Sequence, residues 1–325
     1  MKGPIAFTLA FAASVLTSIA SPLLAQDKID RPVKILVGFA AGGTADVMAR
    51  AVADKMKDSL GQPVIVENRP GAIGRIAADA VKAAPPDGTT IMVMPIGPMA
   101  VVPHSYKTLS YDPIKDFAPI GMGSTFQFAI AAGPQSGAKT WTEYVAWAKA
   151  NPGKSSYATS GAGSLPHFFG VMLGREAGIE MLHVPYKGSA AYMNELIGGN
   201  VPTAVDAIAD LTEQHRAGKV KILASSGAKR SSAVPDVPTF AELGVKGVEA
   251  EGWFGFFAPA NTPKPIIDLL NRSLNQALKS PDVAERLTKL GMDPAPTSPE
   301  EFGRILAADY AKWGPVVKAS GFTAE

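Results

Sequence analysis

The stretch that decides the fold is "ILVGFAAGGTADVMARAVADKM", residues 35–56. It begins with an apolar run typical of a buried strand and ends with apolar residues spaced three and four apart, as in an amphipathic helix. Between them, Gly42 and Gly43 allow a turn with positive φ and precede Thr44, a suitable helix cap. Such a turn leaves backbone N–H groups free at the positive end of the helix dipole, so the stretch predicts an anion-binding loop.

The order of strand and helix repeats along the chain and predicts parallel sheets covered by helices. Strands are expected at residues 32–37, 62–67, 89–94, 155–159, 181–184, 201–207 and 220–224, helices at 45–60, 74–84, 140–150, 165–177, 189–197, 263–279, 281–290 and 299–320, and a long extended apolar segment at 117–132. We therefore expect two α/β lobes, with 117–132 crossing between them and a second crossing around residues 225–229. The predicted boundaries are 26–124 plus 226–325 for one lobe and 125–225 for the other.

The N-terminus indicates export. Lys2 precedes an apolar run, and a small residue, Ala25, ends the segment, which is typical of a cleaved secretory signal over residues 1–25. Cleavage after Ala20 is an alternative, and an uncleaved anchor is another, although the run is short of the roughly 20 apolar residues that span a membrane. Cleavage after Ala25 removes Lys2 alone among the charged residues and changes the formal charge from +2 to +1.

Composition narrows the class of protein. The chain has 46% hydrophobic and 18% charged residues, which fits a globular protein with a large core. It has no cysteine, so an exported form has neither disulfides nor a lipidated cysteine and depends on its core. A formal charge of +2 without a basic stripe argues against nucleic acid as a partner. We expect a periplasmic protein.

Two further glycine loops precede helices. The stretch "YATSGAGSLPHFFG", residues 157–170, repeats the strand–loop–helix order, with Ser164 as a helix cap, and "HVPYKGSAA", residues 183–191, does so less clearly. Ligands of open α/β sheets bind beyond the carboxyl ends of the strands, where these loops lie. Two helix N-termini facing each other across a crevice would hold a ligand that carries carboxylates.

Catalytic patterns are weak. The glycine loops match neither G-x-G-x-x-G nor the P-loop motif, and Pro166 stands where a nucleophile elbow needs its last glycine. The four histidines are scattered, and Asp206 with Asp210 is poor evidence for a catalytic dyad. The sequence therefore predicts a capture protein that is not an enzyme and needs no metal or cofactor. An exported hydrolase using Ser164 and His167 stays open as an alternative.

Eight motifs together resemble a known family, in order and across essentially the whole mature chain. They are "PVKILVGFAAGGTADVMAR", "GQPVIVENRPGAIG", "PDGTTIMV", "YDPIKDFAPI", "SGAGSLPH", "HVPYKGSAA", "VPDVPTFAELG" and "WFGFFAPANTPKPI". With them the chain is similar to the Bug-type solute-binding proteins of tripartite tricarboxylate transporters.

The resemblance implies a type II periplasmic binding-protein fold, an α/β fold of two lobes with a ligand cleft and two crossing connections. It implies a small organic carboxylate as ligand, captured by domain closure, large and small integral membrane transporter subunits as partners, and a monomer. A periplasmic sensor that feeds a signalling system uses the same closure and stays open as an alternative. Carried over by motif, the ligand-binding residues are Phe39, Ala40, Gly42, Gly43, Thr44, Asp46, Thr125, Phe126, Ser160, Gly161, Ala162, Gly163, Ser164, His167 and Asp206.

The chain departs from the family pattern in ways that bear on the ligand. Ala41 replaces a frequent proline, Thr125-Phe126-Gln127 replaces a small polar run, Phe168 and Phe169 follow His167, and Ala207 replaces a frequent asparagine. Added aromatic residues and a lost polar group favour a longer aliphatic or aromatic carboxylate as ligand. The alternative is that Phe168 and Phe169 belong to the core. For Asp46, a role at the helix dipole and a ligand contact are both open.

Overall fold

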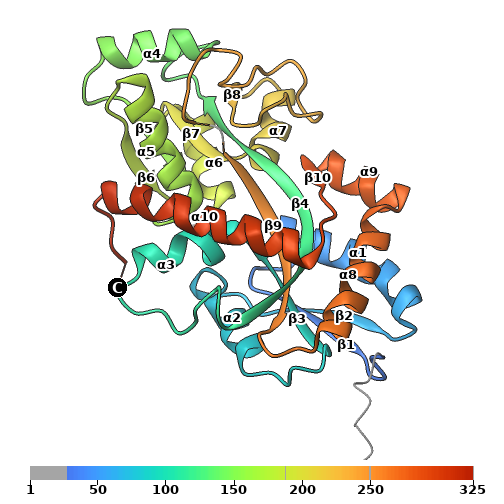
Figure 1. Cartoon of the computed structure of the whole chain (residues 1–325). Helices are drawn as coiled ribbons and strands as arrows, with labels where there is room; N and C mark the ends of the chain where they lie inside the picture. The colour runs from blue at the N-terminus through green and yellow to red at the C-terminus, as the bar shows by residue number, and fades with distance from the viewer. Residues whose placement is uncertain (1–27, 187, 249, 325) are drawn as a thin grey trace, which may run out of the picture.

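The computed structural model describes residues 28–186, 188–248 and 250–324. The predicted signal, residues 1–25, lies outside the described residues. Two α/β lobes are joined through one mixed sheet with the strand order β2-β1-β3-β9-β4-β7-β5-β6, and β8 and β10 also pair with β4 (Figure 1). The strands are β1 (Val33–Val37), β2 (Val64–Asn68), β3 (Thr90–Pro95), β4 (Phe117–Ala132), β5 (Ser156–Thr159), β6 (Leu182–Pro185), β7 (Thr203–Ala207), β8 (Lys221–Ser225), β9 (Glu251–Pro259) and β10 (Met292–Pro294).

The helices follow the expected order with two additions, α3 and α7. They are α1 (Thr44–Leu60), α2 (Arg75–Lys82), α3 (Val102–Ser105), α4 (Trp141–Ala150), α5 (Leu165–Ala177), α6 (Ser189–Ile197), α7 (Ile208–Arg216), α8 (Lys264–Leu278), α9 (Pro281–Lys289) and α10 (Pro299–Ala319). The predicted caps of two helices are confirmed, because Thr140 accepts a hydrogen bond from Glu143 N and Ser164 accepts one from His167 N. The sequence missed α3, which has only four residues, and α7, which directly follows β7 without a loop.

Strand β4 carries the first crossing, as predicted. Residues 117–127 pair antiparallel with β9, and residues 128–132 pair with β7. The second half of β4 is also paired with β8 and the first half with β10. This strand of 16 residues is therefore shared by both lobes, and all but three of its side chains are buried, which explains why its sequence is apolar without alternation.

The second crossing lies later than residues 225–229, where the sequence placed it. Ser226 N donates to Phe128 O at 2.8 Å, and the Phe240 ring packs 5.3 Å from the Trp141 ring, so the chain is still on the second lobe after β8. It leaves at β9, whose first residue, Glu251, pairs with Gln127. No strand is predicted here because "EGWFGFFAP" has neither alternation nor a helical period; the strand is buried on both faces.

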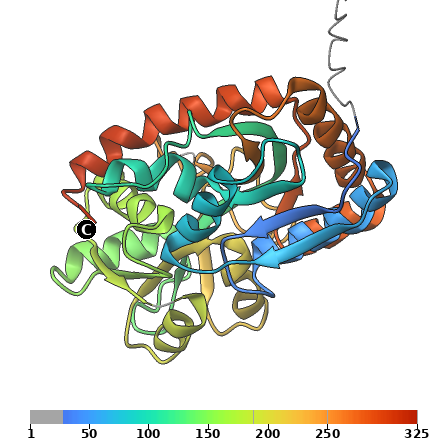
Figure 2. The same ribbon diagram turned by 90° about the horizontal axis from the view of Figure 1, so that it is seen from below.

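The long C-terminal helix α10 runs along one side of the molecule (Figures 1 and 2). It packs on β4 and α3 of the first lobe and touches α5 of the second. Beyond it, the Phe322 ring lies 5.3 Å from His167 and 5.9 Å from Phe168, while Ala324 N donates to Ser105 O at 2.6 Å. The C-terminal segment thus contacts both lobes. Within the described part of the chain, no helix combines the length and apolar character needed to cross a membrane.

Candidate functional site

The first glycine loop connects β1 to α1 and leaves the start of the helix open. Gly42 has φ +83°, whereas Gly43 is extended with φ −73° and occupies the N-cap position. Thr44 is therefore the first helical residue and not the cap that the sequence suggested. Gly43 has no side chain to cap with, so no side chain at the cap position accepts from the N–H groups of the first turn.

The Asp46 side chain holds this loop in place through hydrogen bonds. Its Oδ2 accepts hydrogen bonds from Gly42 N at 2.9 Å and Arg50 Nε at 3.0 Å, and its Oδ1 accepts from Asn68 Nδ2 at 2.9 Å. Burial alone raises the pKa of Asp46, but the hydrogen bonds from Arg50, Gly42 and Asn68 outweigh it and hold this pKa below its usual value. With 3% exposure and its oxygens engaged, Asp46 shapes the loop and does not line the cleft.

The second loop connects β5 to α5 and differs from the first in having a side-chain cap. The Ser164 hydroxyl accepts from His167 N at 3.4 Å and donates to Gly161 O at 2.7 Å. Gly163, with φ +72°, donates its N–H to His167 Nδ1 at 3.2 Å. Its missing Cβ makes room for Phe322, whose ring would stand 2.7 Å from it. The third loop supports the second, since Gly188 N donates to Ser160 O at 3.1 Å.

His167 forms a buried stack behind the second loop. Its ring lies 3.8 Å from the His183 ring, with 12° between the planes, and His183 Nε2 lies 2.8 Å from the Thr159 hydroxyl. Burial lowers the pKa of His167 to about 4, and burial together with His167 lowers that of His183 to about 3. Both imidazoles are therefore neutral near pH 7, and neither lines the cleft.

A cleft of about 330 Å³ lies between the lobes and is walled by residues of both. Its walls are largely apolar and include four phenylalanines, Phe39, Phe126, Phe128 and Phe254. The polar part comprises the α1 start at Thr44, the second loop at Ser160 and Ser164, and the acids Asp206 and Asp210. Among the described residues that line it there is no arginine, lysine or histidine. Its volume suits a small molecule.

The structure brings about half of the predicted site residues to the cleft. Those that line it are Phe39, Gly43, Thr44, Phe126, Ser160, Gly163, Ser164 and Asp206. Those that lie away from its lining are Ala40, Gly42, Asp46, Thr125, Gly161, Ala162 and His167. Thr125 pairs with Trp253 and Asp293 within the sheet. Phe168 and Phe169 are fully buried, which confirms the alternative that they belong to the core.

The sequence missed a segment at the cleft that comes from the end of β3. Residues 95–98, "PIGP", run from the last residue of β3 into a π-helical turn over Gly97–Val101 and line the cleft, as do Ile73, Asp210 and Phe254. The position of 95–98 at the carboxyl end of a parallel strand was the available signal. Phe254 could not be found, because its strand was not predicted.

Asp206, at the end of β7, is buried in the wall of the cleft with 4% exposure. Its Oδ1 accepts from Ala207 N at 2.8 Å, while its Oδ2 has no hydrogen-bond partner among the described residues. Burial first, and then the charge of Asp210, raise the pKa of Asp206 to about 7; the nearby hydroxyls of Ser160 and Tyr192 lower it in part. Asp210 is shifted in the same direction, but its side chain is exposed, so water screens its charge.

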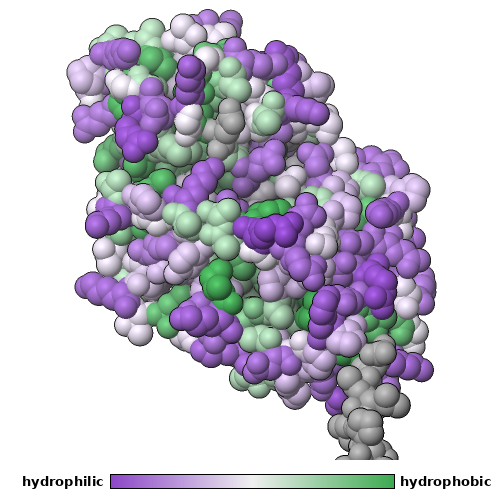
Figure 3. Space-filling view, in the orientation of Figure 1, coloured by the Kyte–Doolittle hydropathy of each residue, from purple (hydrophilic) through white to green (hydrophobic). Residues whose placement is uncertain are grey.

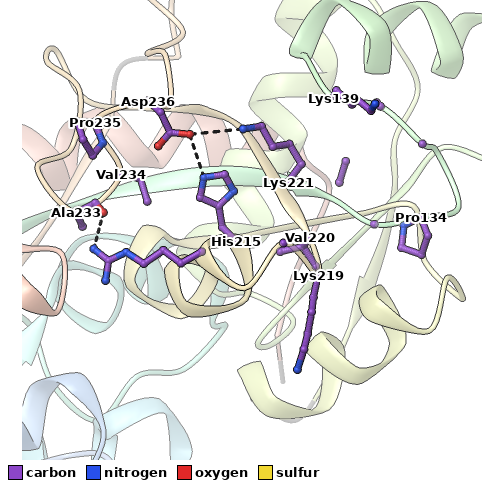
Figure 4. Close-up of a pocket in the computed structure, with 16 residues that line it drawn as sticks. Pro134, Lys139, His215, Lys219, Val220, Lys221, Ala233, Val234, Pro235 and Asp236 are labelled. Atoms are coloured by element: carbon purple, nitrogen blue, oxygen red, sulfur yellow. Dashed lines mark hydrogen bonds and ion pairs between the residues drawn. The ribbon is translucent and has the colours of Figure 1, made fainter.

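A second cavity, of about 730 Å³, lies wholly on the second lobe, and we call it the basic pocket (Figure 4). Its lining includes the exposed cations Lys139, Arg216, Lys219 and Lys221, and one acid, Asp236. Asp236 Oδ2 lies 3.4 Å from His215 Nε2 and 3.5 Å from Lys221 Nζ. Lys139 and Lys219 point away from Asp236 in Figure 4 and form no ion pair within the described chain. The pocket touches none of the glycine loops.

The face in Figure 3 is mostly hydrophilic, with small separate apolar patches. Across residues 28–186, 188–248 and 250–324, no group of three or more His, Cys, Asp or Glu side chains is arranged to hold a metal ion.

Comparison with known proteins identifies the family. A model of the tripartite tricarboxylate transporter family receptor matches residues 48–322. Protein BugT of Bordetella pertussis is 34% identical over 304 residues, which cover 93% of each chain. The periplasmic binding protein BugD is 36% identical, with a TM-score of 0.79 over 91% of this chain and all of its own.

Two structures from Rhodopseudomonas palustris contain ligands. MatC, with bound malate, has 32% identity and a TM-score of 0.78 over 89% of this chain and 99% of its own. A second protein, with adipate, has 32% identity and a TM-score of 0.82 over 90% and 98%. The two lobes, the cleft between them and these matches lead to one conclusion: the chain belongs to the family of tripartite tricarboxylate transporter receptors, which are solute-binding proteins.

Proposed function

We propose that the chain captures a small organic carboxylate in the cleft between its lobes. The observation that carries this proposal is the start of α1, where Gly43 lines the cleft and leaves the N–H groups of the first turn without a side-chain cap. Free N–H groups at a helix N-terminus favour an anion. The related structures with malate and adipate support a carboxylate as that anion.

The walls of the cleft bear on the kind of carboxylate. Phe39 and Phe254 come from the first lobe, and Phe126 and Phe128 from the strand shared by both lobes. Four aromatic rings bury an apolar ligand body well. They support a ligand with an aliphatic or aromatic body, such as a longer dicarboxylate or an aromatic carboxylate, even though Phe168 and Phe169 do not contribute.

Capture would occur by closure of the lobes about β4 and β9, the two strands that cross between them. A ligand that contacts both lobes favours the closed form by its additional contacts there. The lobe boundaries 26–124 plus 226–325 and 125–225 stay a prediction. In β4, pairing with β9 ends at Gln127 and pairing with β7 begins at Phe128, which would move the first boundary there. Phe240 still packs on the second lobe, which would move the second boundary beyond this residue.

We further propose that the protein is exported to the periplasm after removal of residues 1–25, acts as a monomer and delivers its ligand to large and small membrane subunits. The family supports these statements. A sensor would use the same closure. Growth on the identified ligand after deletion of the gene separates uptake from sensing, since only a transport role makes growth depend on the gene.

We propose that the cleft binds its ligand without catalysing a reaction. The hydrolase alternative requires the Ser164 hydroxyl to donate to His167, but this hydroxyl donates to Gly161 O, and His167 Nδ1 accepts from Gly163 N. The contact between the two residues is a helix cap, from His167 N to the Ser164 oxygen. Ester turnover by the purified protein would contradict this part of the proposal.

A thermal-shift screen of the mature protein against mono-, di- and aromatic carboxylates tests the proposal. A ligand at 100 times its Kd stabilises the fold by about 2.7 kcal/mol, which is readily measured. We expect at least one carboxylate to raise Tm and the matching primary amine or alcohol without the carboxylate to have no effect. If no carboxylate in the set stabilises the protein, the proposed function is wrong.

A further inference from the structure

Residues 71–74, "GAIG", form a turn between β2 and α2 with a strained backbone. Ile73 has φ +57° and ψ +41°, and among the described residues it is the only one other than glycine with a positive φ. This left-handed conformation brings Cβ close to a carbonyl oxygen and is most unfavourable for β-branched side chains. Gly71 and Gly74, with φ values of +134° and +83°, have no Cβ and avoid that clash.

The surrounding structure holds this turn in place. Gly74 N donates to Gly71 O at 2.9 Å. Gly74 also packs at the end of β1, since a Cβ added at Gly38 would stand only 2.6 Å from Gly74 Cα. On β3, the Met94 Cε atom would lie 2.9 Å from a Cβ added at Gly74. Packing against two strands therefore keeps Ile73 in a backbone conformation that a β-branched residue disfavours.

Packing in the hydrophobic core does not explain the isoleucine. Ile73 is partly buried, and it belongs neither to the buried core of the described chain nor to the apolar side chains packed against that core. It does line the interlobe cleft. The Phe39 ring, which lines the cleft as well, lies beside the turn, with its Cε2 3.6 Å from a Cβ added at Gly74. Backbone strain that persists at a ligand cleft points to a role in binding.

We propose that Ile73 is a specificity-determining residue: its side chain extends the apolar wall of the cleft and selects carboxylates with an unsubstituted hydrocarbon body over hydroxylated ones of the same skeleton. Methylene groups placed against this wall are removed from water, whereas a hydroxyl there loses its hydrogen bonds to water and gains no partner. The inference rests on the proposed function and deepens it by naming the substrate class. Of the ligands in the related structures, adipate belongs to the favoured class and malate to the disfavoured one.

Thermal melting of two variants tests the strain without any ligand. Ile73→Gly and Ile73→Ala remove almost the same side chain, but only glycine adopts a positive φ freely. Ile73→Gly should therefore melt about 2–5 °C above Ile73→Ala. The matched control is Ile65 in β2, which is 49% exposed and does not line the cleft. Ile65→Gly should melt below Ile65→Ala, because glycine within a strand is less stable than alanine. An Ile73→Gly protein that melts at or below Ile73→Ala would overturn the inference.

Calorimetric titration with two matched pairs of ligands tests the specificity. One pair is adipate and galactarate, which has the same carbon skeleton with added hydroxyls; the other is 3-phenylpropanoate and 3-phenyllactate. Wild type is expected to bind the unhydroxylated member of at least one pair about tenfold or more tightly. Ile73→Ala and Ile73→Gly should both reduce this ratio by about threefold or more, while Ile65→Ala should leave it unchanged. A general loss of structure would weaken both members of a pair and would not change their ratio.

The possible results distinguish the inference from the proposed function. Equal binding within both pairs, tighter binding of the hydroxylated members, or a ratio that is unchanged in folded Ile73→Ala and Ile73→Gly proteins would overturn the inference and leave carboxylate capture standing. Absence of binding by all of these acids would overturn the inference as well. The proposed function would then be decided by the thermal-shift screen, where stabilisation by any other carboxylate supports it.

Discussion

The interlobe cleft and the basic pocket differ in how they present charge. The basic pocket is more than twice as large and has four exposed cationic side chains around one aspartate. The cleft has no cation among its described lining residues, and its donors are backbone N–H groups held by a helix start. Exposed lysines are flexible and strongly hydrated, so ordering them around an anion gains little. Fixed backbone donors beside buried apolar walls need no such ordering. The proposed carboxylate site, the cleft, is therefore not the cavity with the larger number of cations.

The pKa values of Asp206 in the cleft and Asp236 in the basic pocket are shifted in opposite directions. Burial raises the pKa of Asp206 in the cleft to about 7. For Asp236 in the basic pocket, partial burial raises the pKa, but its own backbone N–H, His215 and Lys221 outweigh this effect and lower it. Asp206 has no positive partner among the described cleft residues, whereas Asp236 has Lys221 Nζ at 3.5 Å and the His215 ring beside it. The following predictions use this difference.

Gly43→Val is expected to have the largest effect. An added Cβ would lie 3.3 Å from Ala40 O, so this carbonyl must shift by a few tenths of an ångström, and the φ of −73° suits valine. The branched side chain would, however, cover the free N–H groups of the first turn. We expect at least a 1,000-fold loss of ligand affinity, about 4 kcal/mol, in a calorimetric titration.

The control for Gly43→Val is Gly303→Val in α10, where an added Cβ makes only ordinary contact with Pro119. It should bind ligand like wild type. Wild-type affinity in a folded Gly43→Val protein would move the anion site away from α1.

Asp206→Asn is expected to change the pH dependence of stability. The pKa of Asp206 is raised in the folded state, so its contribution to stability is complete below the unfolded value of 3.8 and is lost as pH rises through about 7. Replacing it by asparagine removes that loss. The free energy of unfolding of the ligand-free protein at pH 8 should rise by on the order of 3 kcal/mol relative to wild type, and by much less at pH 4.

Asp236→Asn should act in the opposite direction. The pKa of Asp236 is lowered, so its small stabilisation is present above pH 4 and is lost as pH falls. Because the side chain is exposed, removing its charge is expected to cost less than about 1 kcal/mol at pH 8. Urea unfolding at the two pH values measures both variants. Parallel pH profiles for the two variants would contradict the contrast between the two carboxyl groups.

Asp46→Ala tests how the cleft holds its donors in place. It removes three hydrogen bonds and leaves Gly42 N without its acceptor, while Asn68 Nδ2 keeps only Phe39 O. We expect a loss of about 2 kcal/mol in the free energy of unfolding, accompanied by weaker ligand binding. Asp46→Asn, which keeps one acceptor oxygen, should recover part of both. Loss of binding with unchanged stability would show instead that Asp46 contacts the ligand.

The sequence predicted the parts of the site that depend on local patterns. Apolar spacing and glycines located α1, α5 and their loops, and the long apolar run located β4. It could not distinguish Gly43 from Thr44 as the cap, because both suit that position and the φ values decide it. It did not predict that Asp46 contacts Asn68 and that His167 stacks on His183, because these partners are distant in the chain. Residues of β9 were missed because their burial is created by β3, β4 and α10 together.

Charge reversal in the basic pocket is expected to have the smallest effect. Lys139 and Lys219 are exposed and form no ion pair within the described chain, so Lys139→Glu combined with Lys219→Glu should leave the fold intact. Neither residue lines the cleft, and charges in water are screened over about 8–10 Å at physiological ionic strength. Ligand affinity at 0.15 M salt should therefore stay within twofold of wild type, with a modest decrease at 0.01 M salt, where screening is weak. A tenfold loss at 0.15 M salt would mean that the anion is held by side-chain charge in the larger cavity, and the backbone donors of α1 would lose their role as the carboxylate site.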